Sequence, residues 1–93
     1  MDLGAFVVVR THSAGVHVGT LAARDGKEVT LTDARRLWSW KGANTLHEIA
    51  NAGVGNGSKV SETVSTVLLT EAIEIISATE AARANLMAAV WAK

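Results

Sequence analysis

Cysteine and proline are both absent from this chain of 93 residues. The lack of cysteine excludes disulfides, thiolate nucleophiles and thiolate metal ligands, and it fits a reducing cytosol. The start of the chain lacks the basic and apolar pattern of a secretion signal, and no apolar run approaches the ~20 residues that span a bilayer. We therefore expect an intracellular protein in solution, without a membrane partner.

Large apolar side chains are scarce. The aromatic residues are three Trp and one Phe, and much of the 48% hydrophobic content is alanine. A chain of this length buries only about 60 to 65% of its unfolded surface. We expect one ligand-binding domain, residues 1–93, with a thin core and with self-association as a homo-oligomer to bury more surface.

No charge of one sign predominates, because nine basic residues balance nine acidic ones. A protein without net charge lacks the positive field that typifies binders of duplex DNA. Duplex nucleic acid is therefore not an expected partner. Any anionic ligand must be held by a local cluster of cations.

The hydrophobic pattern begins with strands. Residues 5–10, AFVVVR, are typical of a strand buried on both faces. Asp25 and Gly26 lie between two alternating runs and predict a hairpin turn, which pairs Ala22 with Val29 and Thr20 with Leu31. The expected inward side is Val18, Ala22, Val29 and Leu31, and the outward side is His17, Gly19, Glu28 and Thr30.

Two capping patterns predict helices. Thr45 and Glu48 form a capping box for a short helix that ends at Gly53, and the box from Ser77 to Glu80 starts a final helix with Trp91 at its end. Between them, residues 60–76 are rich in β-branched side chains and predict one or two strands, although LLTEAIEII (residues 68–76) also fits a helix. The expected fold is α+β: an antiparallel β-meander with a short middle helix and a C-terminal helix, without an internal repeat.

The segment RRLWSWKGAN, residues 35–44, gathers two of the three tryptophans beside three cations. In extended chain, side chains alternate between faces, so Arg36, Trp38 and Trp40 share one side and Arg35, Leu37 and Ser39 the other. Two interpretations of Trp38 and Trp40 remain open: they pack in the core, or they stack a planar ligand beside positive charge. If they share a face, one can serve each purpose.

Two polar bends offer groups that suit phosphate oxygens: RTHSAG, residues 10–15, and the segment 35–45. The start of the short helix at Thr45 adds free N–H groups. We expect Arg10, Arg36 and Lys41 to contact phosphates and Trp38 or Trp40 to stack a base. Base edges or ribose would bond to Thr11, His12, Ser13 and Asn44.

Catalytic and metal patterns are weak. His12 and His17 fall on opposite faces of extended chain, so no metal site is expected. Ser13 beside His12 points away from it, and Glu71 and Glu74 also fall on opposite faces of a strand. Neither the phosphate loop of nucleoside triphosphatases nor a dinucleotide fingerprint is present. We expect no enzyme activity and no cofactor.

The stretches VVVRTHSAGVHVGTLAARDGKEVTLTDARRLWSWKGANTLHEIANAGV (residues 7–54) and LLTEAIEIISATEAA (residues 68–82) resemble a family of small phage proteins of similar length. That family resembles the viral anti-CBASS sponges. The resemblance implies a tetramer that sequesters a cyclic dinucleotide immune signal, such as 3′3′-cyclic GMP-AMP, without cleaving it. It also implies action in the cytoplasm of an infected bacterial host.

Other functions remain open beside this resemblance. Arginine and tryptophan are enriched at protein interfaces, so the same segment fits a small phage structural or interaction module without a nucleotide ligand. Direct inhibition of a host enzyme by protein contact is a third possibility. The segment 35–44 by itself does not separate these functions.

Overall fold

The computed structural model describes residues 2–90, and this part of the chain contains six strands and two helices. The strands are β1 (Phe6–Thr11), β2 (Val16–Asp25), β3 (Glu28–Ser39), β4 (Lys59–Val60), β5 (Val64–Leu69) and β6 (Ala72–Ser77); the helices are α1 (Leu46–Ala52) and α2 (Glu80–Ala88). All strand pairs are antiparallel. The predicted α+β class, the initial meander, the middle helix and the later helix are confirmed.

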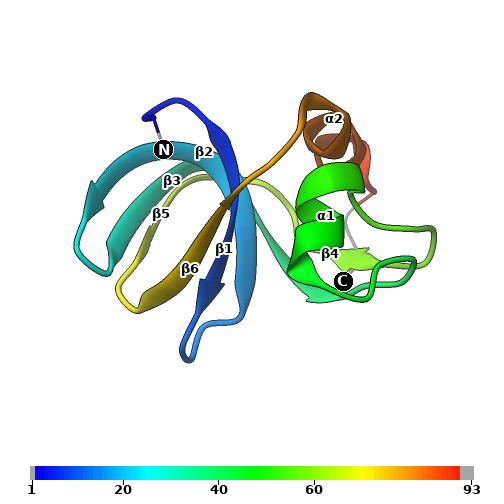
Figure 1. Cartoon of the computed structure of the whole chain (residues 1–93), viewed down its shortest axis with the longest axis horizontal. Helices are drawn as coiled ribbons and strands as arrows, with labels where there is room; N and C mark the ends of the chain where they lie inside the picture. Colours follow the sequence, from blue (N-terminus) through cyan, green and yellow to red (C-terminus); the bar gives the residue numbers. More distant parts are fainter. Residues whose placement is uncertain (1, 91–93) are drawn as a thin grey trace.

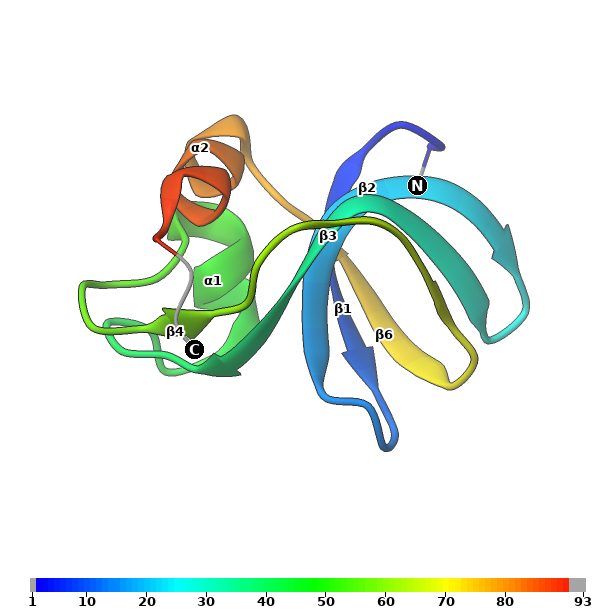
Figure 2. The same cartoon turned by 180° about the vertical axis from the view of Figure 1, so that it is seen from behind.

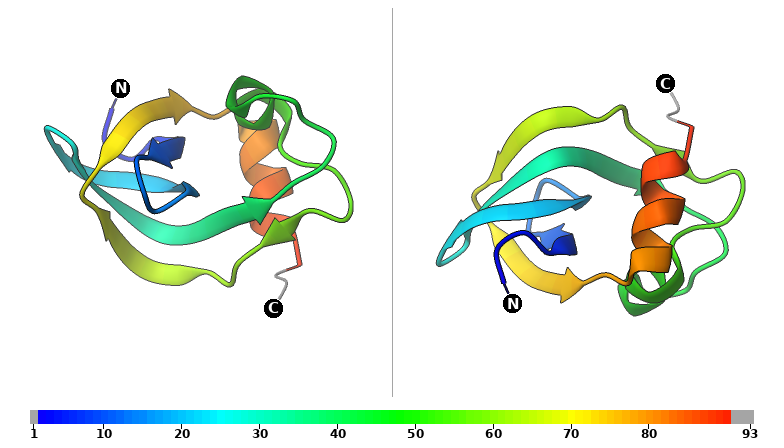
Figure 3. Two further views of the ribbon diagram at one scale, coloured as in Figure 1. Left: turned by 90° about the horizontal axis from the view of Figure 1, so that it is seen from below. Right: turned by 90° about the horizontal axis from the view of Figure 1, so that it is seen from above.

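The sheet is curled. Its order is β4-β3-β2-β1-β6, and β5 pairs with β3 beside β4. Strands β5 and β6 therefore lie on opposite edges, although only residues 70 and 71 connect them. So short a connection requires the two edges to approach each other, and the sheet bends into the open ring seen in Figure 3.

The curl creates two separate cores. One lies inside the ring and contains Val7, Val9, Leu21, Val29, Leu31, Ala34, Leu69 and Ala72. The other lies between the sheet and the helices and contains Phe6, Val8, Val18, Leu37, Ile49, Ala50, Val60 and Leu86. Strand β1 separates the two cores, so its successive residues alternate between them, and its predicted burial on both faces is confirmed. In Figure 1, β1 lies in the middle of the molecule between β6 and β2.

Strand β3 connects the two halves of the molecule. Its first part pairs with β5 in the curled sheet, and its last residues pair with β4 beside the helices. Figure 2 shows β3 crossing from the curled sheet toward β4. The end of β3 therefore carries its side chains to the junction of the two halves.

The predicted hairpin turn is wrong by one position. Asp25 pairs with Glu28 and Arg24 with Val29, so Gly26 and Lys27 form the turn. Gly26 has φ +60° and is the first central residue, the position where a type II′ turn favours glycine. A register irregularity then follows between Leu21 and Ala23.

The shifted register changes which residues of β2 face inward. Leu21 lies in the core inside the ring, whereas Ala22 is exposed, contrary to the prediction. His17, expected on the outward side, is only 4% exposed. At the start of β2 both faces are covered. One face turns toward the inside of the ring, and the other packs in the core between the sheet and the helices.

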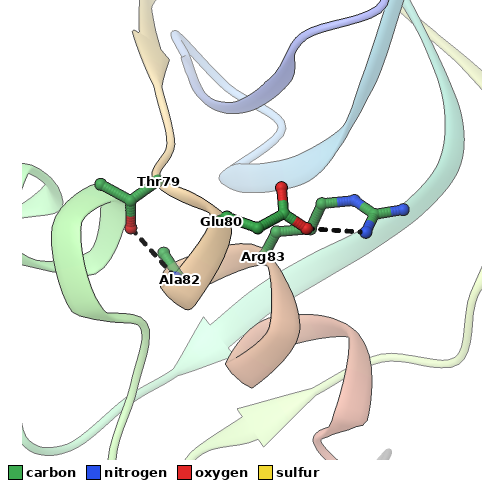
Figure 4. Close-up of polar contacts among 4 residues, drawn as sticks. All are labelled: Thr79, Glu80, Ala82 and Arg83. Atoms are coloured by element: carbon green, nitrogen blue, oxygen red, sulfur yellow. Dashed lines mark hydrogen bonds and ion pairs between the residues drawn. The ribbon is translucent and has the colours of Figure 1, made fainter.

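The two helices have polar caps. The side chain of Thr45 accepts a hydrogen bond from the Glu48 N–H at α1, and Gly53 ends this helix, as predicted. At α2 the N-cap is Thr79 rather than Ser77; its hydroxyl accepts from the Ala82 N–H (Figure 4). Trp91 lies outside the described residues.

The caps also join the helices to each other. The Thr79 hydroxyl donates to the Asn51 carbonyl at the end of α1, and Asn85 of α2 bonds both the N–H and the carbonyl of Val54. Within α2, Arg83 forms an ion pair with Glu80 (Figure 4). Neither described helix has the length and apolar composition that crossing a membrane requires.

Candidate functional site

The segment 35–39 is extended and alternates as predicted. Arg36 and Trp38 are exposed, whereas Arg35 and Leu37 are buried. Trp38 is 47% exposed, which is unusual in a chain that has few aromatic side chains with which to fill its core. The adjacent arginines therefore differ in role, and only Arg36 is available to a ligand.

Arg35 stabilises the fold. Its Nη1 donates to the carbonyls of Leu86 (2.9 Å) and Ala89 (2.7 Å) at the end of α2, and its Nε donates to the Ser61 carbonyl (2.8 Å). The last turn of α2 contains no basic residue of its own. Arg35 thus supplies from the sheet the cation that a helix C-terminus favours, although burial lowers the pKa of its guanidinium.

A shallow pocket of about 690 Å³, the Trp38 pocket, lies where β3 meets the turn between β1 and β2. It combines one guanidinium and two indoles with the backbone of a tight turn. Its lining residues are Ser13, Ala14, Gly15, Val16, Arg36, Leu37, Trp38 and Trp40. Four of the predicted site residues, Ser13, Arg36, Trp38 and Trp40, therefore come together here.

A cation that the sequence did not indicate contacts the Trp38 ring. The Nζ of Lys59 lies 4.9 Å from the centre of the Trp38 ring, a cation–π contact. Pairing of Lys59 with Ser39 in the short β3–β4 ladder places it there. Lys41, predicted as a phosphate contact, instead extends beside Gly57 and does not line the pocket.

Trp40 has the more structural role of the two tryptophans. It is half-buried and packs against the core beneath the helices. One side of it lines the Trp38 pocket, and it also lines a second pocket of about 360 Å³, the Arg10 pocket. The Arg10 pocket is lined by Arg10, Val16, Trp40, Thr45, Leu46, His47 and Glu74.

The remaining predicted residues line neither pocket. Thr11 is buried, and its hydroxyl donates to the Gly15 carbonyl and accepts from the Ala14 N–H, so it stabilises the turn. His12 and Asn44 are exposed outside both pockets. Ser13 does line the Trp38 pocket, but its hydroxyl already donates to the Glu71 carboxylate.

The expected anion site at the start of α1 is occupied by the protein itself. The Glu48 carboxylate accepts from the Asn44 N–H, and the Thr45 hydroxyl accepts from the Glu48 N–H. A carboxylate at this position repels an added anion. Arg36 is the cation that the Trp38 pocket offers to phosphate, whereas Arg10 shares its pocket with the Glu74 carboxylate.

The groups that line the Trp38 pocket can stack a planar ring and bond an anion. Indole faces stack planar groups, and an exposed guanidinium bonds phosphate or carboxylate oxygens in pairs. Among residues 2–90, no three His, Asp or Glu side chains gather as metal ligands. The arrangement fits a planar anionic ligand.

Comparisons with known proteins identify the family and leave its activity open. No curated protein and no solved structure matches the chain. A family model described as a domain of unknown function (DUF6948) matches residues 4–86, and the chain therefore belongs to that family.

Proposed function

We propose that this protein is a viral sponge that binds a cyclic oligonucleotide immune signal, most simply a cyclic dinucleotide, in the Trp38 pocket without cleaving it. The observation that carries the proposal is the exposure of Trp38, 47%, directly beside the exposed Arg36. A purine stacks on the indole while the guanidinium bonds its phosphate. Lys59 adds a second positive charge at the same ring.

Self-association would complete the site. The Trp38 pocket is wide and shallow, whereas ligand sites bury most of the ligand surface. A second copy of the chain placed over the pocket would supply the missing wall, and symmetric oligomers build such shared sites readily. We propose a homotetramer, as the resemblance to the sponges implies, acting in the cytoplasm of an infected bacterium.

Isothermal titration calorimetry of the full chain with cyclic di- and trinucleotides tests this function. The unmodified protein should bind at least one of them, and Trp38→Ala should weaken that binding while the protein stays folded. Mass spectrometry of the ligand released by heating should recover it intact. A panel without heat of binding would refute the sponge, and a cleaved ligand would make the protein an enzyme.

A second candidate function is protein interaction, and a specific observation favours it. Val64 and Leu68 on β5 and Ile73 on β6 are exposed apolar residues at the outer strands of the curled sheet. Exposed apolar surface of this kind is typical of interfaces. Leu68→Lys would abolish such an interaction, measured by pull-down from phage-infected cells, and leave nucleotide binding unchanged.

A further inference from the structure

A third pocket lies on the other side of Arg36 from the tryptophans. This His17 pocket has a volume of about 290 Å³ and forms between β2, β3 and the segment that leads into β5. Its lining residues are His17, Ala34, Arg35, Arg36, Ser61, Glu62, Val64 and Val67. Arg36 also lines the Trp38 pocket, so this one guanidinium lies between two pockets.

His17 presents a hydrogen-bond acceptor to this pocket. Its Nε2 lies 3.0 Å from the Ala14 carbonyl oxygen, which only accepts, so Nε2 carries a proton and donates. Burial and the nearby Arg36 lower the pKa of His17, although the Ala14 bond opposes this, and the ring is neutral at pH 7. In the neutral tautomer with a proton on Nε2, the other ring nitrogen, Nδ1, accepts.

Nδ1 has no hydrogen-bond partner within residues 2–90 and is nevertheless reached by solvent. Every described polar side-chain atom that is sealed from solvent has a partner, so the unpartnered Nδ1 is not sealed. The residue is only 4% exposed, and it is among those that line the His17 pocket. A buried imidazole thus keeps one acceptor free toward a cavity.

The other polar groups divide into occupied and available ones. Arg35 is bonded to backbone carbonyls, and the Ser61 hydroxyl accepts from the Arg36 N–H and donates to the Glu62 carbonyl. Glu62 and the Arg36 guanidinium form no side-chain hydrogen bond or ion pair with another described residue. Among the residues that line the pocket, the groups left available are two acceptors, His17 Nδ1 and the Glu62 carboxylate, and one donor, the Arg36 guanidinium.

This donor and acceptor pattern selects a type of ligand. The Glu62 carboxylate repels phosphate, so an uncharged group with N–H donors suits the pocket better than an anion does. The volume is below that of sites for drug-sized ligands, which begin at about 300 Å³, and the apolar walls of Ala34, Val64 and Val67 suit one flat ring system. Guanine carries N1–H and N2–H donors beside the O6 acceptor, which complements two acceptors beside a guanidinium.

We propose that the His17 pocket binds a guanine base, with His17 Nδ1 and Glu62 accepting its N–H groups and Arg36 at its O6 side. The inference rests on the proposed function, since Arg36 then lies between a guanine in this pocket and a base stacked on Trp38. Adenine carries an acceptor at N1, where guanine carries a donor, and this places a lone pair against the Glu62 carboxylate. A site built on such hydrogen bonds rejects the base that lacks them.

Calorimetry with cyclic di-GMP and cyclic di-AMP, together with GMP and AMP, tests the pocket. The unmodified chain should prefer the guanine ligand of each pair. Glu62→Gln should weaken the guanine ligands by about tenfold or more, the effect of losing a hydrogen bond to a charged group, and it should not weaken the adenine ligands, because the amide no longer repels adenine N1. Glu28→Gln, at an exposed carboxylate in the distant β2–β3 hairpin, is the matched control and should change nothing.

A second measurement reports on His17 directly. Nitrogen-15 NMR of the ring should show the Nδ1 resonance shifting when GMP is added and remaining unchanged when AMP is added.

The possible outcomes distinguish the guanine pocket from the proposed sponge function. If cyclic dinucleotides bind through Trp38 but Glu62→Gln weakens guanine and adenine ligands alike, or neither, the guanine pocket is refuted and the sponge stands. If GMP binds through Glu62 and no cyclic nucleotide binds, the pocket stands and the sponge falls. If nothing binds, both are wrong.

Discussion

The two adjacent arginines of β3 should separate stability from binding. Arg35→Met removes a buried cation whose three shortest bonds, of 2.7 to 2.9 Å, reach the end of α2 and the Ser61 carbonyl. Methionine fills much of the volume but donates nothing, so these carbonyls lose their partner. We expect the free energy of unfolding to fall by about 3 to 5 kcal/mol, as when one partner of a buried charged network is removed.

That loss is large for a domain whose total stability is about 5 to 15 kcal/mol. With a urea dependence of about 2 kcal/mol per molar, it corresponds to a midpoint shift of about 1.5 to 2.5 M. Arg36→Met is the matched control, because this side chain is exposed and forms no side-chain bond with another described residue; its effect should stay within about 0.5 kcal/mol. Calorimetric titration with a cyclic dinucleotide should give the opposite result, because Arg36→Met should no longer bind the nucleotide.

Urea unfolding followed by circular dichroism provides the measurement for both variants. Two results would contradict this assignment. One is a free energy of unfolding for Arg35→Met that lies within about 1 kcal/mol of the value for the unmodified chain. The other is a loss of stability in Arg36→Met as large as the loss expected for Arg35→Met. The first result would mean that water replaces the guanidinium at the end of α2. The second would mean that Arg36, which lies between the Trp38 pocket and the His17 pocket, stabilises the fold instead of binding a ligand.

Three further perturbations follow from the contacts. Trp38→Ala should lower cyclic dinucleotide affinity by about 1 to 3 kcal/mol without moving the urea midpoint, whereas Trp40→Ala should lower the unfolding free energy by about 2 kcal/mol; the reverse pattern would contradict the assignment. Gly53→Ala should lower the thermal midpoint, since Gly53 has φ +82° and an added Cβ would collide with the side chain of Asn85; an unchanged midpoint would show that α2 can move away. Acidification should destabilise the protein through His17: its pKa in the folded state lies below the ordinary 6.5, so the unfolded chain binds the extra proton and stability falls as the pH drops below about 6.5. Unfolding measured from pH 7.5 to 5 should show a smaller decline for His17→Gln.

Local patterns predicted much of the secondary structure. The β-branched run at residues 5–10, the capping box at Thr45 and the glycine after α1 each specify an element through contacts within a few residues. The placement of Arg36 and Trp38 on the side opposite Leu37 also followed from alternation along one strand, but their exposure did not, because alternation does not tell which side is covered. Errors arose where two local signals competed, as at Ser77 and Thr79, or where glycine fits more than one turn position, as at Gly26.

The sequence by itself determined the α+β class, the zero net charge and the gathering of tryptophans and cations in residues 35–44, because composition and short-range periodicity contain that information. Only the tertiary structure decided that the sheet curls, which buries His17 and places Glu62 beside Arg36 in one pocket. It also decided that Arg35 caps α2 and that Lys59, rather than Lys41, contacts Trp38. Lys59 and Trp38 are 21 residues apart in the sequence, Glu62 and Arg36 are 26 apart, and Arg35 and Leu86 are 51 apart. No local pattern records which distant residue will approach a given side chain.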